Sequence, residues 1–522
     1  MYTELIASIP ELIARHAARQ PDKAAFTDSR SSVTYAALSL STANLAGNLQ
    51  ALGVAPGDRV AMLLPNSVQW IQACLAIARA GATSVPISYD SALPEIAYRL
   101  SDSGSKVLIT TDEQMERIAG LLRDAPAITH VILASRGAPG TQGLRFDDLV
   151  AQTPTASPRD PESLDHPAFI IYTSGTTGRA KGVMLSVRSM LWVTAACWAP
   201  QMGLSAHDNV LSPLPLFHSY ALNLSVLSIL AVGASEHIVE KYSTQEVIAL
   251  LKTGRFTVMP GVPTMFHYLL EAAKAGGVSG LPGLRCFISA GAIMPGPLND
   301  AFEKQFGVPL LDGYGITETA TMVTMNGLTG SRVPGSCGLP VPGLAVRIVD
   351  AESGRDADPG KEGELIVRGP NLMLGYYNQP EATAGAIREG WYHTGDLAKS
   401  DKHGFLTITG RLKELIIRGG QNIAPAEVEA AVGEYRDVLD CAVIAAPHDK
   451  LGEVPVVFVV PRPGATVHAD ALLAHCRTQL SSYKVPTAVY VTGSIPRTGS
   501  GKTMRYKLRE TLDAGQATPA AG

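Results

Sequence analysis

Residues 172–182 read YTSGTTGRAKG, and they follow an apolar run, FII, at 169–171. A buried strand that ends in a turn rich in glycine, hydroxyl groups and positive charge can wrap a chain of phosphates. Glycine lets the backbone approach a ligand closely and adopt positive φ angles. A plain polar connection between a strand and a helix is the alternative, but so many donors without an acidic residue disfavour it. We therefore predict phosphate contacts from Thr173, Ser174, Gly175, Thr176, Thr177, Gly178 and Lys181.

Two common nucleotide-binding motifs do not fit the chain. The Walker pattern needs a glycine, four residues and then Gly-Lys-Ser/Thr, and 172–182 does not provide it. The sequence at 501–503 reads GKT, but Pro496 stands where the first glycine belongs. The dinucleotide fingerprint also fails, because Gly313 and Gly315 are followed by no third glycine at the required offset. Both of the corresponding folds are therefore disfavoured.

Length and composition are those of an ordinary α/β enzyme. At 522 residues, the chain is too long for one hydrophobic core and should form two or more domains. A net charge of −4 gives no electrostatic reason to bind nucleic acid or an acidic membrane. The six cysteines are widely spaced, as expected for reduced thiols in a cytoplasmic protein. Charged residues interrupt the N-terminal segment, which argues against a signal peptide, and the apolar run 221–234 is too short to span a bilayer.

Short apolar runs that alternate with helix-like segments predict an α/β fold with parallel-type sheets. Candidate strands lie at 60–64, 84–87, 107–110, 131–134 and 169–171. From 335 to 410 the sequence is rich in strands and turns, which predicts a small β-barrel-like part. After Arg411 the pattern becomes that of a compact α+β domain. We therefore predict a large N-terminal domain of several subdomains at 1–411, a small C-terminal domain at 412–522, and a disordered tail beyond Asp513.

Residues 312–320 read DGYGITETA and predict the second half of a nucleotide site. The run at 308–311 leads into a glycine turn that carries Thr317 and Glu318. Magnesium prefers hard oxygen ligands, and phosphates and water usually complete a shell with few protein carboxylates. A single glutamate beside a phosphate-facing threonine suits such an ion. A turn followed by a helix start is the alternative, because Thr and Glu also favour helix N-termini.

Three further stretches hold candidate site residues. In WYHTGDL (391–397) and the Gly-Arg pair at 410–411, Asp396 and Arg411 could hold the hydroxyls of a ribose, with a plain turn as the alternative. In PLPLFHSY (213–220), His218 lies between aromatic residues, and a packed histidine is the alternative to a substrate contact. In PRTGSGKTMR (496–505), Lys502 could stabilise charge on the reacting oxygens of a closed, dry site. A basic surface loop is the alternative for this last stretch.

Taken together and in this order, the motifs resemble those of the acyl-adenylate-forming superfamily. This group holds acyl-CoA ligases, luciferases and the adenylation domains of peptide synthetases. The phosphate loop departs from the usual family form at Ala180, where proline is common. The resemblance implies a catalytic set of Lys502, Thr317, Glu318 and His218, with Glu318 holding Mg²⁺.

The resemblance also implies the remaining site residues. The adenine and ribose would lie against Ala290, Gly291, Ala292, Asp312, Gly313, Tyr314, Asp396 and Arg411. The acyl pocket would include His218, Tyr220, Gly261 and Gly315. The channel for the CoA thiol would pass Gly419 and Gly420, and the small domain would move about a hinge at Lys413.

The implied function is that of an ATP-dependent acyl-CoA ligase. Such an enzyme joins a carboxylic acid to the α-phosphate of Mg-ATP, releases pyrophosphate, and passes the acyl group from acyl-AMP to coenzyme A. The segments expected to line the acyl pocket are apolar, which favours a fatty or aryl acid. The stretch QNIAP at 421–425 departs from the ENIYP of many bacterial fatty acyl-CoA ligases, which leaves the contacts to the thiol acceptor open.

Two other functions stay open at this point. A standalone adenylation enzyme would load the acyl group onto the phosphopantetheine of an acyl carrier protein instead of coenzyme A. A degenerate nucleotide-binding regulator would also share the fold, although the retained Lys502 and Glu318 argue against it. The choice between a monomer and a homodimer is left open by the sequence.

Overall fold

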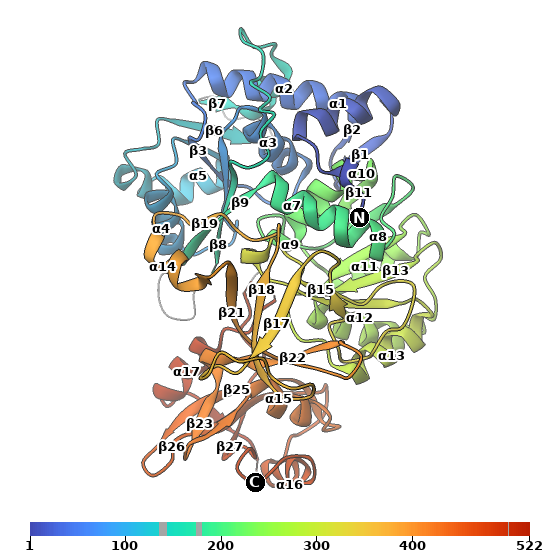
Figure 1. The fold of residues 1–522 in the computed structure, drawn as a ribbon, viewed down its shortest axis with the longest axis vertical. Coiled ribbons are helices and arrows are strands. Elements are labelled where there is room, and N and C mark those ends of the chain that lie inside the picture. Colours follow the sequence, from blue (N-terminus) through green and yellow to red (C-terminus); the bar gives the residue numbers. More distant parts are fainter. Residues whose placement is uncertain (135–142, 174–179, 499–500, 522) are drawn as a thin grey trace.

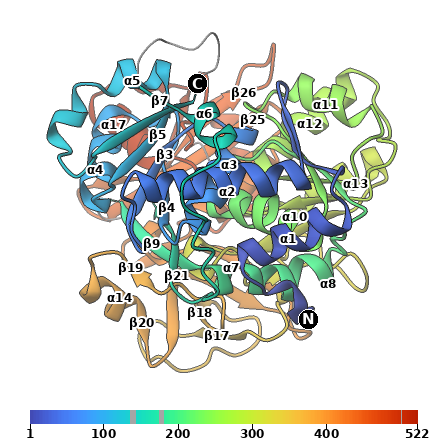
Figure 2. The ribbon, with the colours of Figure 1, turned by 90° about the horizontal axis from the view of Figure 1, so that it is seen from above.

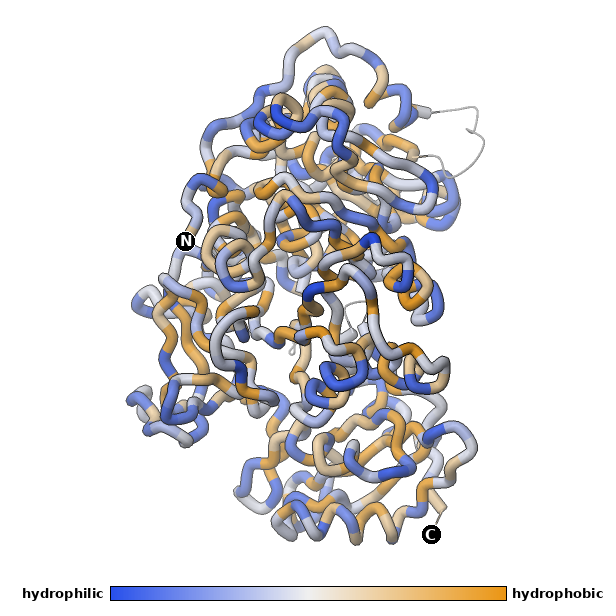
Figure 3. Tube along the Cα trace, turned by 90° about the vertical axis from the view of Figure 1, so that its right-hand side faces the viewer, coloured by the Kyte–Doolittle hydropathy of each residue, from blue (hydrophilic) through white to orange (hydrophobic). Residues whose placement is uncertain are grey.

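The computed structural model describes residues 1–134, 143–173, 180–498 and 501–521 (Figure 1). Two large sheets with helices on their faces form most of the N-terminal part, and a smaller domain lies at the opposite end of the long axis. The helices α1 (Ile9–Arg19), α2 (Tyr35–Ala51) and α3 (Val68–Arg79) cross the large domain in Figure 2. Figure 3 shows hydrophilic segments mainly in the outer loops. The predicted α/β class, with a small α+β domain, is confirmed.

An eight-stranded sheet follows the order β19-β9-β8-β4-β3-β5-β6-β7. The strands from β8 to β7 along this order run parallel, whereas β9 returns antiparallel to β8. The five candidate strands named above are all present, with ends shifted by no more than two residues. The bounds are β3 (Arg59–Leu63), β4 (Thr83–Pro86), β5 (Val107–Thr111), β6 (His130–Ala134), β7 (Leu144–Arg145), β8 (Pro167–Thr173), β9 (Lys181–Ser186) and β19 (Gly375–Tyr376).

A nine-stranded sheet follows the order β16-β15-β14-β13-β12-β10-β11-β1-β2 and is parallel from β14 to β1. Its strands are β1 (Ala24–Thr27), β2 (Ser32–Thr34), β10 (Asn209–Ser212), β11 (Ser235–Ile238), β12 (Val258–Gly261), β13 (Cys286–Ser289), β14 (Leu310–Tyr314), β15 (Thr324–Met325) and β16 (Leu339–Pro340).

The two faces of the nine-stranded sheet are covered differently. One face packs a continuous helical stretch made of α9 (Ser219–Ala221), the π-helical segment η4 (Leu222–Ser228) and α10 (Ile229–Val232), which covers most of the apolar run at 221–234. The other face packs α12 (Pro263–Ala275) and α13 (Gly296–Phe306) through a cluster of phenylalanine rings. The first of these two faces bears on the site described below.

A small antiparallel sheet stands where the sequence predicted the barrel-like part. Its order is β17-β18-β21-β20, and β22 also pairs with β21. The strands are β17 (Ala345–Val349), β18 (Gly363–Arg368), β20 (Ile387–Arg388), β21 (Trp391–Ser400) and β22 (Leu406–Arg411). The predicted domain boundary at 411/412 falls at the end of β22 and stays a prediction.

The small C-terminal domain is built on a six-stranded sheet with helices against it. The strands are β23 (Ile416–Arg418), β24 (Gln421–Ile423), β25 (Val438–His448), β26 (Gly452–Pro461), β27 (Ala488–Val491) and β28 (Thr518–Pro519). The helices are α15 (Pro425–Gly433), α16 (Ala469–Gln479) and α17 (Arg505–Asp513).

The prediction of a disordered tail was wrong. Strand β28 pairs with β27, and the N–H of Ala520 donates to the carbonyl oxygen of Val489 at 2.9 Å. The small residues of the tail can lie flat along a sheet edge and pair with its otherwise open backbone groups. Within the described residues, no helix is both long enough and apolar enough to cross a bilayer.

Candidate active site

The donor-rich stretch stands between two strands that pair with each other. Strand β8 ends at Thr173 and β9 begins at Lys181, and these two residues face each other across the antiparallel pair. The strand-to-helix connection considered above is therefore excluded. The Nζ atom of Lys181 lies 4.7 Å from the centre of the Tyr376 ring. The other predicted phosphate contacts, Ser174, Gly175, Thr176, Thr177 and Gly178, lie outside the described residues.

The glycines at 313 and 315 are required by close contacts. A Cβ on Gly315 would lie 1.2 Å from the carbonyl oxygen of Thr321, and one on Gly313 would lie 2.4 Å from Cε of Met322. The first contact is with backbone, so only hydrogen fits there. The chain after β14 folds back tightly on itself and places the short helix η5 (Thr317–Thr319) against β9.

The helix η5 presents the threonine and the glutamate that the sequence singled out. Thr317 is buried, and its Oγ1 lies 3.0 Å from Oγ of Ser219 at the start of α9. Oε1 of Glu318 accepts a hydrogen bond from the hydroxyl of Tyr376 at 3.1 Å. No group of three or more His, Cys, Asp or Glu side chains that could hold a metal occurs in the described part of the chain. A lone carboxylate fits magnesium, because substrate phosphates and water usually complete the coordination shell of this ion.

Asp396 and Arg411 lie together, as the ribose prediction requires. They face each other between β21 and β22, and Nε of Arg411 lies 2.7 Å from Oδ1 of Asp396. The Tyr314 hydroxyl donates to Oδ2 at 2.5 Å. Burial raises the pKa of Asp396, while Arg411 and Tyr314 oppose the rise. Because a carboxylate has about four lone-pair sites, this one could accept sugar hydroxyls in addition to its present donors.

The neighbouring strands β13 and β14 carry a buried serine and a buried aspartate next to each other. Ser289 ends β13 and faces Asp312 in β14. Oγ of Ser289 and Oδ1 of Asp312 have no hydrogen bond of ordinary geometry within the described residues. Burial raises the pKa of Asp312 well above its usual range. Unsatisfied buried polar atoms are rare, so this pair fits a ligand with a hydrogen-bonding edge, such as adenine.

The residues after Ser289 are the predicted wall of the adenine site. Ala290 is buried, whereas Gly291 and Ala292 are partly or fully exposed. Gly291 has a φ of 90°, a conformation that favours glycine. The backbone therefore turns outward immediately after the strand, as a wall of an open site would.

His218 caps the helix that leads into the core. Its Nδ1 accepts a hydrogen bond from the backbone N–H of Tyr220 at 3.2 Å, so a neutral ring carries its proton on Nε2. Burial and, next, the positive charge of Lys502 lower the pKa of His218 to about 3. The imidazole is therefore neutral at physiological pH and can donate a hydrogen bond without adding charge.

Tyr220 and Gly261, both predicted to line the acyl pocket, have defined packing roles. The Tyr220 hydroxyl donates to the carbonyl oxygen of Ile288 at 3.3 Å, and its ring stacks on Trp198 with centres 6.2 Å apart. A Cβ on Gly261 would lie 2.7 Å from the Phe266 ring. The need for glycine at 261 is thus explained by core packing, and its role in an acyl pocket stays a prediction.

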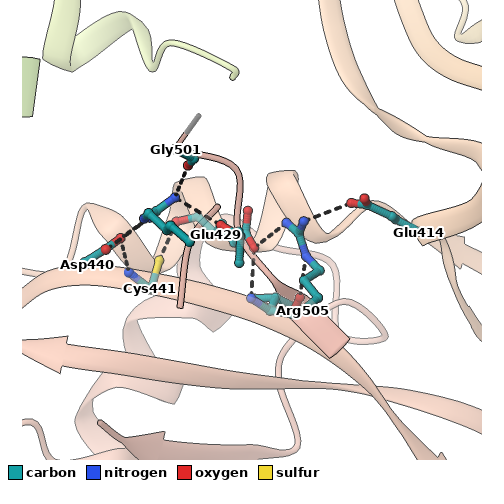
Figure 4. A network of polar contacts seen from close by, with 9 residues as sticks. Glu414, Glu429, Asp440, Cys441, Gly501 and Arg505 are labelled. Atoms are coloured by element: carbon teal, nitrogen blue, oxygen red, sulfur yellow. Dashed lines mark hydrogen bonds and ion pairs between the residues drawn. The ribbon is translucent and has the colours of Figure 1, made fainter. Parts of the chain in front are cut away.

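The residues on either side of Lys502 are held by a polar network, part of which Figure 4 shows around Asp440 and Gly501. Nη2 of Arg497 pairs with Asp440 at 2.8 Å, and Nη1 donates to Oγ1 of Thr503 at 3.0 Å. The backbone N–H and C=O of Lys502 both bond Thr498. The Lys502 side chain is therefore free of the contacts that shape its turn.

Charged side chains of the large domain lie close enough to Lys502 to change its pKa. Burial and then the charge of Arg411 lower its pKa, while Asp396 and Glu318 oppose the fall. A Cβ on Gly501 would lie 3.1 Å from Val262 of the large domain. Residues of the large and the small domain thus meet at one site.

The two glycines predicted for the thiol channel lie on an exposed turn, and their role in a channel stays a prediction. Gly419 and Gly420 form the two-residue turn between β23 and β24, with φ angles of 57° and 84°. Both are exposed, and a Cβ on Gly420 would meet nothing within 4 Å. A hairpin turn with two positive φ angles explains the glycine pair on its own. Lys413, the predicted hinge, lies exposed on η6 (Leu412–Glu414) between β22 and β23.

Sequence reasoning missed four residues that structure the site. Ser219 and Tyr376 contact predicted site residues, Arg497 bonds Thr503 next to Lys502, and Trp198 stacks on Tyr220. Ser219 and Arg497 stand inside motifs already quoted, so their positions offered a signal. Tyr376 and Trp198 lie outside every quoted motif, and only the fold brings them in.

Comparison with known proteins agrees with this geometry. A family model described as AMP-binding enzyme matches residues 13–377, and one described as AMP-binding enzyme C-terminal domain matches 427–502. Feruloyl-CoA synthase of Amycolatopsis sp is 36% identical to the chain, covering 95% of it and 97% of the relative. A long-chain-fatty-acid–CoA ligase of Yersinia pestis is 33% identical, covering 97% and 94%. The crystal structure of an anthranilate CoA ligase with anthranoyl-AMP matches with a TM-score of 0.90 and 26% identity, covering 97% and 98%.

The fold and the nucleotide-type site define an enzyme of the adenylate-forming class. The chain belongs to the AMP-binding enzyme family, and it is an AMP-forming acid–thiol ligase of the acyl-CoA synthetase kind.

Proposed function

We propose that this ligase activates a bulky apolar acid of the aryl type and transfers it to coenzyme A. The observation that carries the proposal is the aromatic wall formed by Trp198 and Tyr220, whose ring planes differ by 23°. Its polar ends are already bonded, because Nε1 of Trp198 donates to Asn223 at 2.6 Å and the Tyr220 hydroxyl bonds backbone. Both side chains are buried, so the core beside His218 is aromatic and leaves no free polar group at these two rings, which suits a planar apolar substrate.

Asn223 does not provide a polar contact for the substrate. Its Oδ1 accepts from Trp198, and its Nδ2 donates to the carbonyl oxygen of Met190 at 2.8 Å. The similar proteins named for feruloyl and anthranoyl groups support an aryl acid, and the one named for long-chain fatty acids defines the competing outcome.

In the first half-reaction, a carboxylate oxygen of the acid attacks the α-phosphorus of ATP. A new P–O bond forms and the bond to pyrophosphate breaks, which yields acyl-AMP. Negative charge grows on the α-phosphate oxygens, where the ammonium of Lys502 and the hydroxyl of Thr317 would stabilise it. Neutral His218 would donate Nε2–H toward the acid without neutralising its carboxylate. Glu318 would hold Mg²⁺, which when bound neutralises charge on the phosphates.

In the second half-reaction, the thiol sulfur attacks the acyl carbon and the bond to AMP breaks. The thiol proton passes to solvent, the carbonyl oxygen stays in the thioester, and AMP leaves with the oxygen that bridged the acyl carbon and the phosphorus. The exposed hairpin at Gly419 and Gly420 would have to turn toward the site for this step, with Lys413 as the hinge. Each half-reaction would then use its own face of the small domain.

The test is mass spectrometry of products from the full chain, Mg-ATP, CoA and an acid panel. The panel pairs aryl acids, such as cinnamates, benzoates and arylacetates, with alkanoates of matched carbon number. We expect aryl-CoA thioesters and AMP. Preferential formation of alkanoyl-CoA would refute the aryl assignment, and acyl-AMP that accumulates without thioester would indicate a carrier protein as the acceptor.

A further inference from the structure

Tyr376 lies between two oppositely charged side chains of the candidate site. Its hydroxyl donates to Oε1 of Glu318 at 3.1 Å, and the face of its ring receives the ammonium of Lys181 at 4.7 Å. The tyrosine itself is only 7% exposed. One buried side chain therefore contacts the residue predicted to hold the metal and the residue predicted to hold phosphate.

Strand pairing explains how the tyrosine reaches the lysine. Tyr376 in β19 faces Val183 in β9 across an antiparallel pair. Lys181 precedes Val183 by two positions on the same strand, so both side chains lie on one face of the sheet. Diagonal neighbours on such a face lie within reach of long and aromatic side chains.

The same short segment is tied to the glutamate. The N–H of Met373 donates to the carbonyl oxygen of Glu318 at 2.8 Å, and the N–H of Tyr376 donates to Oγ1 of Thr383 at 2.9 Å. The segment 373–376 thus connects η5 and β9 through a backbone hydrogen bond and strand pairing.

The tyrosine gives each charge a partner other than the opposite charge. A carboxylate gains from a hydroxyl donor, and an ammonium gains from an aromatic face. Among the ion pairs of the described residues, none joins Lys181 to Glu318, although both contact one ring. A direct pair would neutralise the two groups and cover the position that metal and phosphate need.

We propose that Tyr376 is a positioning residue that keeps Lys181 and Glu318 apart and oriented for Mg-ATP. The inference rests on the roles proposed above for Lys181 and Glu318. It assigns two separable tasks to one side chain: the hydroxyl orients the carboxylate, and the ring face orients the ammonium.

Three variants of the full chain separate these tasks. Tyr376→Phe removes the hydroxyl and keeps the ring, Tyr376→Leu removes both, and Tyr392→Phe is the matched control. The Tyr392 hydroxyl lies 3.4 Å from that of Tyr376, so the control removes a neighbouring hydroxyl from the same cluster. Binding of Mn²⁺ to the protein with α,β-methylene-ATP is measured by electron paramagnetic resonance. Binding of the metal-free analogue in EDTA is measured by titration calorimetry.

We expect Tyr376→Phe to weaken Mn²⁺ binding about tenfold, because a hydrogen bond to a charged group is lost. Metal-free binding of the analogue should stay within about twofold, since the ring still faces Lys181. Tyr376→Leu should weaken the metal-free binding as well, by about fivefold. In turnover, excess Mg²⁺ should restore the kcat of Tyr376→Phe, because only the affinity for metal is lowered.

Unchanged Mn²⁺ binding in Tyr376→Phe would overturn the inference, and so would an equal loss in Tyr392→Phe. An equal loss of metal-free binding in both Tyr376 variants would overturn the role of the ring. If Tyr376→Leu does not fold, Tyr376→Phe still decides the role of the hydroxyl. The binding measurements need no acid, so a failure of the proposed aryl specificity would not be mistaken for a failure here.

Discussion

Lys502→Ala should separate the two half-reactions. The side chain lies near Asp396 and Arg411, whereas the turn that carries it is held by Arg497 and by backbone bonds to Thr498. Removing the ammonium should therefore leave the turn in place. Losing one preorganised charge-stabilising group costs about 10²–10³ in rate, or about 3–4 kcal/mol in the barrier.

The assay measures each half-reaction alone. Pyrophosphate release from Mg-ATP and acid should fall about 10²–10³-fold in Lys502→Ala. Formation of thioester from preformed acyl-AMP and CoA should stay within about threefold, because no α-phosphate is attacked in that step. Lys507→Ala, which removes an exposed lysine five positions away, is the matched control.

The pH dependence of the first half-reaction provides a second check. Burial and Arg411 lower the pKa of Lys502, so the active ammonium should be lost at a pH below that of an ordinary lysine. Lys502→Arg, which stays charged, should shift that alkaline limb upward if it retains activity. Equal losses in both half-reactions of Lys502→Ala would refute the division of labour.

Three other substitutions test the fold around the site. Arg462→Ala breaks an ion pair of 2.9 Å to Glu271 on α12, in which both side chains are about a third exposed. It should slow acyl-AMP formation by no more than about fivefold, and Glu271→Ala should have the same effect. Additive losses in the double variant would contradict an energetic coupling between the two side chains. Glu236 is 1% exposed and burial raises its pKa well above the usual range, so the native state loses stability as pH rises through that folded-state pKa. Glu236→Gln should therefore raise the Tm, measured by calorimetry, more at pH 8 than at pH 5. An equal gain at both pH values would refute the raised pKa of Glu236. Gly315→Ala would place a Cβ 1.2 Å from a backbone oxygen, so the backbone of the site must shift and ATP binding should weaken more than tenfold, about the effect of a misplaced binding group. The control Gly385→Ala, which has open space around the new Cβ, should bind ATP normally in titration calorimetry.

The fold was largely predictable because its signals are local. Alternating apolar runs indicated the parallel strands β3, β4, β5, β6 and β8. The prediction of a disordered tail failed because the order of the tail depends on a distant strand. Its residues have low intrinsic preference for order, and only the open edge of β27 gives them a partner.

The candidate site likewise has features with local sequence signals and features that depend on long-range contacts. By itself, the sequence determined the class of chemistry, because donor-rich glycine turns and an isolated lysine motif have recognisable local patterns. Only the tertiary structure decided that Tyr376 contacts both Lys181 and Glu318, that Ser219 meets Thr317, and that Gly419 and Gly420 lie exposed on a hairpin turn. These facts depend on strand pairing and packing between segments far apart in the chain. Such contacts are set by how whole elements bury their apolar faces, and no short stretch of residues encodes them.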